Sequence, residues 1–193
     1  MVMSVERLFS RQCPKSITGD PSMFRKSANP MTGEDVLGIL GQVQHREPLG
    51  AAVLDAQIAQ DKNARAKCVG TLQAYLASTG VNDNLAFALA EAATAEVCDS
   101  PACKKCHGTG SILSKEHSKF VECPRCNGVG RYIPSQRELH QMVCHLLPAE
   151  QAVTRYEFNK KWYDVYMGCV DKLHRAAGQA GQCARVLLDG MDV

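Results

Sequence analysis

Four cysteines in two closely spaced pairs are the residues of this sequence whose spacing best supports a defined chemistry. The segment CKKCHGTG begins at Cys103 and is repeated as CPRCNGVG from Cys123, so both copies read CxxCxGxG. A CxxC turn lets two thiolates converge on one ion, and zinc prefers four such ligands in a tetrahedron. The glycines permit the left-handed backbone that follows the second cysteine of each pair. We therefore expect Cys103, Cys106, Cys123 and Cys126 to bind one structural Zn²⁺ ion.

Other interpretations of these cysteines are weaker. Cys103–His107 reads CxxCH, the attachment motif of c-type haem, but the second copy has Asn127 in place of the histidine. A redox CxxC normally accompanies a thioredoxin-like βαβ pattern, which this sequence lacks. Burial of four cysteines simply as small residues leaves the repeated spacing and glycines unexplained. His107 and His117 could each replace a cysteine ligand, but four cysteines make this unnecessary, and we expect both histidines to be exposed.

The segment between the cysteine pairs predicts a β-hairpin. Sixteen residues separate the pairs, and the stretch SILSKEHSKFVE has β-branched and aromatic residues spaced as in two short strands. Pro134 closes the unit, so a zinc-ribbon-like hairpin is expected over residues 101–134. So few apolar residues could hardly order this loop alone, whereas zinc binding is worth roughly 10–16 kcal/mol in small zinc modules.

The chain before the hairpin is predicted to be helical from residue 32 to residue 100. Thr32 is the expected N-cap of the first helix because acidic residues follow it in the first turn. An Ala/Gln-rich helical pattern then runs from about Ala51 to Ala77, with a break near Gly70, and a further helix begins at Asn82 or Asp83.

The first 31 residues show no sustained helical period. We expect residues 1–31 to form a flexible segment, with a short helix near Val5–Phe9 as the alternative. Hydrophobic residues make up 45% of the whole chain and charged residues 22%, which excludes a wholly disordered protein.

Two helices with strong start signals follow the hairpin, in residues 135–193. Ser135–Glu138 and Thr154–Glu157 each match the capping-box pattern. The short connection between the helices predicts a helix–turn–helix, and a last helix is expected from about Ala180 to Leu188, returning to the helical body. The predicted fold class is therefore mostly α: a helical bundle with an inserted zinc-bound β-hairpin and a helix–turn–helix.

Charge is distributed unevenly along the chain and points to a polyanionic partner. Residues 103–137 hold seven Lys/Arg and two Asp/Glu, whereas residues 32–102 hold four Lys/Arg and nine Asp/Glu. Basic side chains bind DNA mainly by releasing its condensed counterions, and the second helix of a helix–turn–helix enters the major groove. We expect DNA contacts from basic residues of the hairpin unit and from the start of that helix: Lys104, Lys105, Lys115, Lys119, Arg125, Arg131, Arg137, Arg155, Tyr156, Asn159, Lys160 and Lys161.

The sequence contains no convincing catalytic constellation. Walker A and HExxH motifs are absent, and no Ser/His/Asp set stands out. His140 and His145 lie near Cys144 on one predicted helix and are interpreted as exposed histidines. An apolar stretch suited to a signal peptide or a membrane span is also missing. We therefore expect a non-enzymatic cytoplasmic protein with reduced cysteines and no membrane partner.

Several segments resemble the Q antitermination proteins of lambdoid phages. CKKCHGTG and CPRCNGVG, the IPSQRELHQMVCHLLP helix and the KKWYDVY stretch carry the resemblance, and CPKS and TGEDVLGIL near the N-terminus add to it. CxxCxGxG alone is less specific, because it also resembles the cysteine-rich region of DnaJ chaperones. Those proteins have four copies, whereas this chain has two and lacks the HPD tripeptide of a J-domain.

The resemblance implies a phage transcription antitermination factor in the host bacterial cytoplasm. Such proteins bind DNA at a late promoter, load onto paused host RNA polymerase that still holds its sigma factor, and suppress pausing and termination. The zinc ligands carry over to the four paired cysteines, and the DNA-binding helix–turn–helix to roughly residues 135–173. A zinc-ribbon protein-interaction or chaperone-like module is the alternative function, and an enzyme with a thiol active site is a third class.

Overall fold

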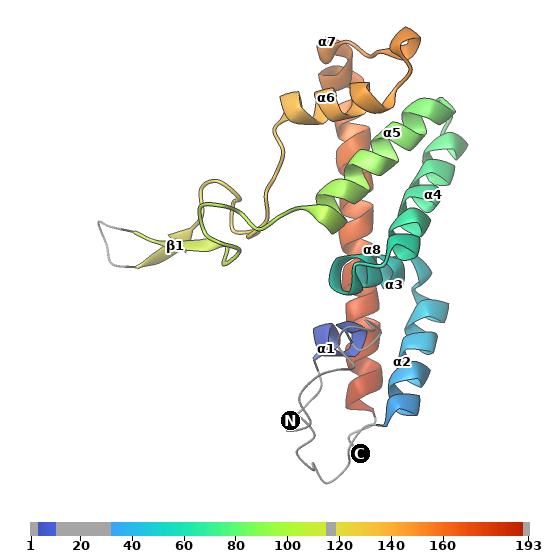
Figure 1. Ribbon diagram of the computed structural model, residues 1–193, viewed down its shortest axis with the longest axis vertical. Helices are drawn as coiled ribbons and strands as arrows, with labels where there is room; N and C mark the ends of the chain where they lie inside the picture. Colours follow the sequence, from blue (N-terminus) through green and yellow to red (C-terminus); the bar gives the residue numbers. More distant parts are fainter. Residues whose placement is uncertain (1–3, 11–31, 115–118, 191–193) are drawn as a thin grey trace. The chain divides into compact units, whose positions relative to one another are not determined.

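The computed structural model describes residues 4–10, 32–114 and 119–190 (Figure 1). The chain is mostly helical, with one small antiparallel sheet of two strands in the described part. It divides into two compact units: residues 1–71 with 171–193, and residues 72–170. No helix in the described ranges combines the length and apolar character of a membrane span. The segment boundaries expected from the sequence stay predictions.

The first unit is built around one apolar core. It contains helices α1 (Val5–Ser10), α2 (Gly33–Arg46) and α3 (Pro48–Leu54), and the C-terminal part of α8 (Tyr163–Asp189). Thr32 begins α2 as predicted, in a full capping box with Asp35. The buried side chains of this core come from α1, α2, α3 and α8: Val5, Leu8, Phe9, Val36, Ile39, Leu40, Val43, Ala51, Ala180, Ala184 and Leu188.

Helix α1 gives residues 5–10 a fixed place in this core, unlike the flexible segment predicted for residues 1–31. Leu8 and Phe9 are fully buried there, so the helix left open as the alternative is the one that forms. Six residues are too few to be stable as an isolated helix, and the order therefore comes from packing that the local pattern does not reveal. The remainder of the predicted segment, residues 11–31, lies outside the described residues.

The break predicted near Gly70 lies ten residues earlier. After α3 the helix continues as the π-helical turn η3 (Asp55–Ala59). This helical segment ends at Gln60, whose φ of 55° is left-handed. Helix α4 (Lys62–Ser78) then runs without interruption through Gly70. The Asp61 carboxylate starts it by accepting the backbone N–H of Asn63 at 2.7 Å. A side-chain cap at Asp61 thus determines the break, whereas a helix tolerates one interior glycine.

The second unit contains a helical part with an alanine-rich core. Helix α5 (Asp83–Thr94) is capped by Asn82 as predicted, and continues into the π-helical turn η4 (Ala95–Asp99). Helix α6 (Gln136–Leu146) packs against α5. Then follow the 3-10 turn η5 (Ala149–Gln151), the single turn α7 (Arg155–Glu157), the π-helical turn η6 (Phe158–Trp162) and the start of α8.

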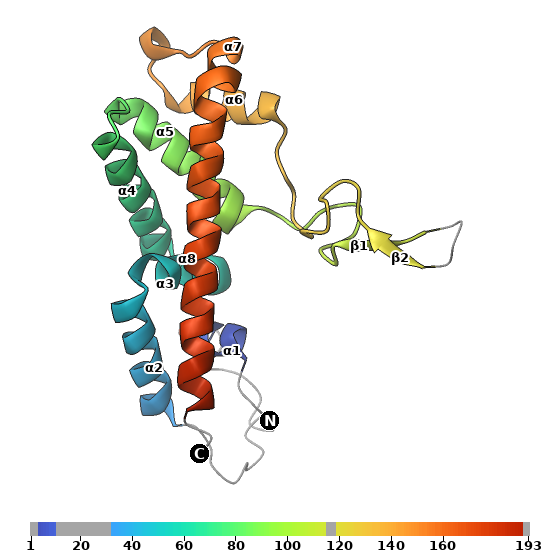
Figure 2. The same ribbon diagram turned by 180° about the vertical axis from the view of Figure 1, so that it is seen from behind.

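A separate C-terminal helix from about Ala180 is not present, because α8 runs unbroken from Tyr163 to Asp189 (Figure 2). Its buried positions keep helical spacing throughout, from Tyr166 and Val170 through Leu173 to Ala184 and beyond. The glycines of this stretch interrupt nothing, and no proline is present to end the helix. The apolar stripe therefore carries one helix through the region where the sequence suggested a boundary.

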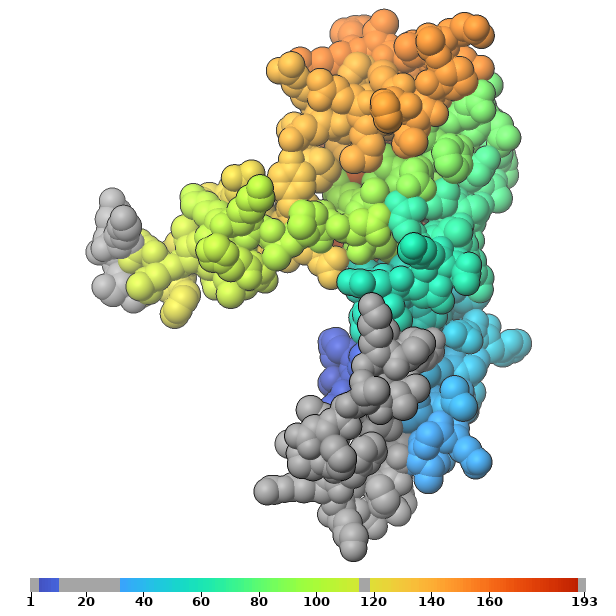
Figure 3. Space-filling model, viewed as in Figure 1, coloured from blue at the N-terminus to red at the C-terminus, as the bar shows by residue number. Residues whose placement is uncertain are grey.

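The predicted hairpin is present between the two cysteine pairs. Strand β1 (Ser111–Leu113) pairs antiparallel with β2 (Phe120–Glu122), with Ile112 opposite Val121 and Leu113 opposite Phe120. An isolated bridge joins Ala102 to Arg131 below the strands. In the space-filling view the chain entering the hairpin lies directly against the chain leaving it (Figure 3). The hairpin thus brings the two copies of the repeat together.

Candidate metal centre and basic surface

Each cysteine pair ends in the same left-handed turn. His107 and Gly108 in the first copy have φ values of 52° and 90°, and Asn127 and Gly128 in the second have 46° and 82°. Glycine adopts such angles freely, and Asn and His are among the residues that tolerate them best. The turn is therefore set locally by residue type in both copies, which is why the repeat could be recognised from the sequence.

Reciprocal backbone hydrogen bonds join the two copies of the repeat. The Cys103 N–H donates to the Gly130 carbonyl at 2.8 Å, and the Cys123 N–H donates to the Gly110 carbonyl at the same distance. The last glycine of each copy also lies against the backbone of the other. A Cβ on Gly110 would come within 2.2 Å of the Gly128 oxygen, and one on Gly130 within 2.4 Å of the Gly108 oxygen. Residues 103–110 and 123–130 thus form a nearly two-fold symmetric unit, called here the cysteine clasp.

The clasp brings four sulfur atoms to one point. Cys103 Sγ lies 3.9 Å from Cys123 Sγ, Cys106 Sγ lies 3.7 Å from Cys126 Sγ, and all four lie within 4.8 Å of one another. Zn–S bonds of about 2.3 Å in a tetrahedron place sulfurs about 3.8 Å apart. All four cysteines are buried. The sulfurs can therefore hold a metal ion, in a geometry that suits zinc.

Backbone donors and burial act differently on the thiols. The backbone N–H groups of Cys106 and Lys105 lower the pKa of Cys103 to about 7, because they stabilise its thiolate. Burial raises the pKa of Cys126 to about 11, although the Gly130 N–H donates to its sulfur at 3.3 Å. A cation held between the sulfurs would supply the positive charge that keeps all four thiolates ionised.

No histidine of the described residues belongs to the sulfur cluster. His107 is exposed as predicted and occupies the left-handed turn beside Cys106. His117 lies outside the described residues. Four cysteine sulfurs already complete a tetrahedral set, so the structure supplies no need for a nitrogen ligand.

The clasp and the hairpin between its two halves, residues 101–134, form the clasp region, and Glu138 connects the end of this region to α6. Its carboxylate accepts the Ser135 N–H at 2.7 Å in the predicted capping box, and also accepts the Tyr132 hydroxyl at 2.6 Å. The Ser135 and Tyr132 hydrogen bonds, with the nearby charge of Arg125, lower the pKa of Glu138 to about 2. The capping box was visible in the sequence, but the role of Tyr132 was missed, because no sequence signal marks a side chain that reaches back to a cap.

Of the basic residues predicted to contact DNA, all those that the structure describes in or beside the clasp are exposed. Lys104, Lys105, Lys119, Arg125, Arg131 and Arg137 are exposed in or beside the clasp, whereas Lys115 lies outside the described residues. They differ in their surroundings. Arg131 donates weakly to the Val97 carbonyl at 3.4 Å, while Arg125 lies near Glu138. Lys104 and Lys105 make no hydrogen bond or ion pair with their side chains within the described residues, so their charges remain available to a partner.

The candidates in the helix that starts after Thr154 are also exposed: Arg155, Tyr156, Asn159, Lys160 and Lys161. The Thr154 hydroxyl accepts the Glu157 N–H at 3.2 Å, so Thr154 is the N-cap, but the reciprocal bond of the predicted capping box does not form. Lys160 Nζ lies 3.4 Å from the Tyr156 hydroxyl, and Lys161 Nζ lies 4.4 Å from the centre of the Trp162 ring. The connection from α6 extends from Leu147 to Thr154, longer than the turn of about three to four residues that is usual in a helix–turn–helix.

Comparison with known proteins places this chain in a family. A family model described as "Conserved hypothetical protein CHP02642" matches residues 2–102 and 100–191. The two matches together cover nearly the whole chain, clasp included. The chain belongs to this family. The description of the family names no activity, so the site geometry and individual relatives must supply the function.

Three relatives of this CHP02642 member carry an informative name. Antitermination protein Q of Escherichia phage HK022 is 24% identical over 185 residues, which is 84% of this chain and 89% of that protein. Antitermination protein Q of Escherichia phage lambda and that of Salmonella phage P22 are each 23% identical over the same shares. The resemblance to the lambdoid-phage Q proteins predicted from the motifs is confirmed.

One cysteine–histidine pair in this CHP02642 member lies outside the clasp. Cys144 Sγ is 3.3 Å from His140 Nε2, but that nitrogen also lies 2.8 Å from the Val153 carbonyl oxygen. A carbonyl only accepts, so Nε2 carries the proton and cannot take one from the thiol. The ring of His140 also packs edge-on against Phe158. His140 is thus half-buried rather than exposed as predicted, and it ties α6 to the following helix.

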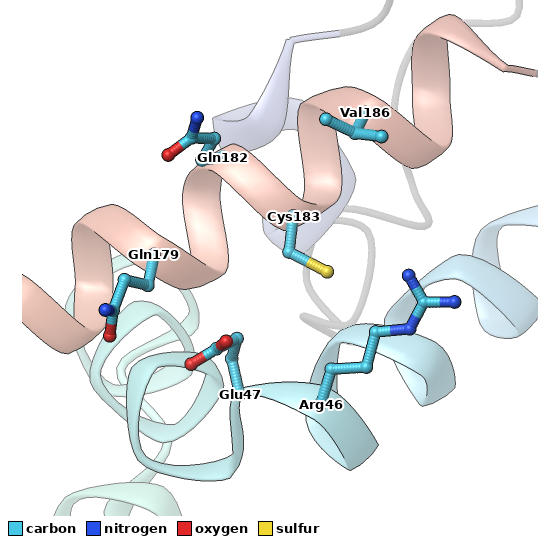
Figure 4. Close-up of a pocket in the computed structure, with 6 residues that line it drawn as sticks. All are labelled: Arg46, Glu47, Gln179, Gln182, Cys183 and Val186. Carbon is cyan, nitrogen blue, oxygen red and sulfur yellow. The ribbon is translucent and has the colours of Figure 1, made fainter.

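A shallow groove lies elsewhere, within the first unit (Figure 4). Its volume is about 300 Å³, and the residues lining it come from the α2–α3 junction and α8: Arg46, Glu47, Gln179, Gln182, Cys183 and Val186. The groove combines one basic and one acidic group with a single thiol, which matches neither a metal site nor a nucleophile with its base. The cysteine clasp therefore remains the best-defined site in the described residues of this CHP02642 member.

Proposed function

We propose that this protein is a phage transcription antitermination factor. It binds double-stranded DNA at a late promoter, loads onto paused host RNA polymerase that still holds its sigma factor, and suppresses pausing and termination. The observation that carries the proposal is the similarity to three antitermination proteins Q, which spans 84% of this chain and 89% of each relative. The proposed role requires binding and no catalysis, so the protein is proposed not to be an enzyme.

One zinc ion is the proposed cofactor, and its role is structural. The ligands are Cys103, Cys106, Cys123 and Cys126, whose sulfur spacing suits a tetrahedral ion. The ion holds the two copies of the repeat as one rigid unit, so less entropy is lost when nearby side chains dock on a partner.

The proposed DNA surface consists of the exposed basic residues of the clasp region and the start of the helix after Thr154. Lys104 and Lys105 are its strongest members, because they occupy the first cysteine turn and their side chains make no hydrogen bond or ion pair within the described residues. Helix α6 and the helix from Arg155 are proposed to act as a helix–turn–helix with a long turn, and to read the major groove through Arg155, Tyr156 and Asn159. The acidic helices of residues 32–102 are the proposed polymerase-facing surface.

In vitro transcription tests the proposal. A template carries the late promoter of the parent phage followed by a terminator, and host polymerase transcribes it with and without the zinc-loaded protein. We expect a larger fraction of full-length transcripts with the protein. The double variant Lys104→Ala/Lys105→Ala should reduce this gain and weaken the salt dependence of DNA binding, whereas Arg175→Ala, at an exposed arginine of α8 outside both proposed surfaces, should do neither. Unchanged termination with the wild-type protein would refute the proposal.

A polypeptide-binding, chaperone-like module is the second candidate. It is favoured by the exposed apolar side chains of residues 101–134: Leu113, Phe120, Val121, Val129 and Ile133. Suppression of aggregation of an unfolded test protein, without any binding to DNA at low salt, would support this alternative. A thiol enzyme, the third class considered, would have to retain thiol–disulfide exchange after metal removal.

A further inference from the structure

The hairpin presents an aromatic and an aliphatic side chain to solvent as a cross-strand pair. Leu113 and Phe120 are directly opposite each other in the antiparallel register, and such opposed side chains share one face of the sheet. Phe120 is 78% exposed and Leu113 58% exposed. This pair is the most exposed apolar feature among the described residues of the clasp region.

The clasp does not need Leu113 and Phe120 in order to fold. Ile112, on the other face of β1, is the apolar residue that packs against the four cysteines. The alternation of side chains along a strand therefore puts Leu113 and Phe120 away from the sulfur cluster. Exposed apolar side chains mark an interaction site when they are grouped and rimmed by polar residues, and Leu113 and Phe120 are grouped as a cross-strand pair.

The electrostatic surroundings of the pair favour an anionic ligand. Lys119 precedes Phe120 and is exposed, and its side chain makes no hydrogen bond or ion pair within the described residues. Glu122 shares the face, but its carboxyl group reaches toward the second cysteine turn, where it lies 3.7 Å from the point that a Cβ on Gly128 would occupy. Residues 103–137 together carry seven Lys/Arg and two Asp/Glu.

The size of the pair favours a small flat ligand over a protein surface. A stable protein interface buries about 800 Å² on each partner, from about 20–30 residues. The pair offers two side chains, far fewer than such an interface needs. Every nucleic-acid base has a π-face that stacks on an aromatic side chain, and a nearby cation neutralises the adjoining phosphate.

We propose that Phe120, backed by Leu113 and flanked by Lys119, stacks on an unpaired base of single-stranded nucleic acid. This goes beyond the proposed function, in which the basic surface meets double-stranded DNA. Paired bases in a duplex hide their faces in the stack, so the hairpin discriminates between strands that are open and strands that are paired.

Fluorescence anisotropy with the full-length zinc-loaded protein tests this proposal. The probes are fluorescein-labelled oligonucleotides of mixed sequence: single-stranded DNA, single-stranded RNA and the matching DNA duplex. Phe120→Ala should weaken single-strand binding about five- to 150-fold, the range for loss of one stacked base, and change duplex binding less than twofold. Phe120→Tyr keeps a ring and should bind as the wild type does. The RNA and DNA arms show which strand is preferred.

Val129→Ala is the matched control, because Val129 is also apolar and 57% exposed in the clasp. It should leave single-strand binding unchanged, and every variant should hold one zinc. Equal single-strand affinity of Phe120→Ala and wild type overturns the inference, as does an equal loss on single strand and duplex. Readthrough lost in Phe120→Ala with all oligonucleotide binding intact also overturns it and assigns the pair to a protein partner. Absent duplex binding by the wild type would instead count against the proposed function.

Discussion

The cysteine clasp and the core of the first unit are ordered by different means. In the clasp region, Ile112 is the partly buried apolar side chain that packs against the four cysteines. The first unit instead buries side chains such as Leu8, Phe9 and Val43 completely. A core of that kind is stabilised by removal of apolar surface from water, whereas the clasp has tight backbone contacts and four sulfurs that can hold a metal ion. The comparison indicates that a few cysteines and glycines can order a short segment that has no hydrophobic core.

The comparison is tested most strongly by removing the metal. Chelation, or the substitution Cys123→Ser, should abolish the order of the clasp, because metal binding supplies roughly 10–16 kcal/mol in small zinc modules. Hydrogen exchange measured by NMR should show loss of protection at the N–H groups of Cys103 and Cys123, while amides of α2 stay protected. Retained protection of the clasp in the metal-free protein would contradict the comparison.

Cavity formation tests the apolar side of the same comparison. Phe9 is fully buried in the first unit, and Phe9→Ala should cost about 3–5 kcal/mol of unfolding free energy through lost burial and a cavity. Urea denaturation followed by circular dichroism measures the loss. Zinc content per chain should stay at one under native conditions, and a variant that lost its zinc instead would show that the clasp depends on this core.

Glycine substitutions sharpen the account of the clasp backbone. Gly130 has a φ of 79°, and a Cβ there would lie 2.4 Å from the Gly108 oxygen. Gly130→Ala should cost about 2–3 kcal/mol from the left-handed backbone and the steric overlap, seen as weaker zinc affinity in a competition titration. Gly70→Ala is the control of opposite sign. A Cβ at Gly70 meets nothing within 4 Å, so this change should stabilise α4 by about 0.5–1 kcal/mol.

The buried carboxyl of Asp55 should make the stability of the first unit depend weakly on pH. Burial raises the pKa of Asp55 to about 6, and its Oδ1 has no hydrogen-bond partner among the described residues. The folded state therefore holds this proton more tightly than the unfolded state, whose pKa is near 3.8. Stability from Asp55 is fully present below pH about 4, falls as the pH rises to about 6 and stays constant above.

Asp55→Asn should remove this slope. The unfolding free energy of the wild type should fall by about 1–2 kcal/mol from pH 4 to pH 7 relative to that of the variant. Denaturant titrations of both proteins at matched pH values measure the difference. Parallel pH profiles for the two proteins would show that Asp55 is ionised in the folded state throughout.

Local signals in the sequence predicted much of the site and its supports. The cap residues Thr32, Asn82 and Ser135 begin helices as expected, because a cap interacts with backbone only two or three residues away. The left-handed turns after the cysteine pairs were predictable for the same reason, because neighbouring residues in the chain set them. The break at Gln60 was misplaced at Gly70, since both residues fit a helical pattern and only the cap at Asp61 decides between them.

Contacts between distant residues were not predictable in this way. Tyr166 is fully buried and its hydroxyl donates to the Glu96 carboxylate; burial first, and then this hydrogen bond, raise the pKa of the tyrosine. These residues are seventy positions apart, and neither has a motif that names the other. The Tyr132 bond to Glu138 and the burial of α1 were missed for the same reason.

The sequence by itself determined the ligand set and the turns around it, because two CxxCxGxG copies specify thiol spacing and left-handed backbone within eight residues each. Only the tertiary structure decided that the copies interlock through Gly110 and Gly130, that α8 is one continuous helix, and that Phe120 faces solvent beside Leu113. The physical reason is how far apart in the sequence the interacting residues lie. Backbone turns and caps depend on neighbours in the chain, whereas burial depends on surfaces that meet only when the chain has folded.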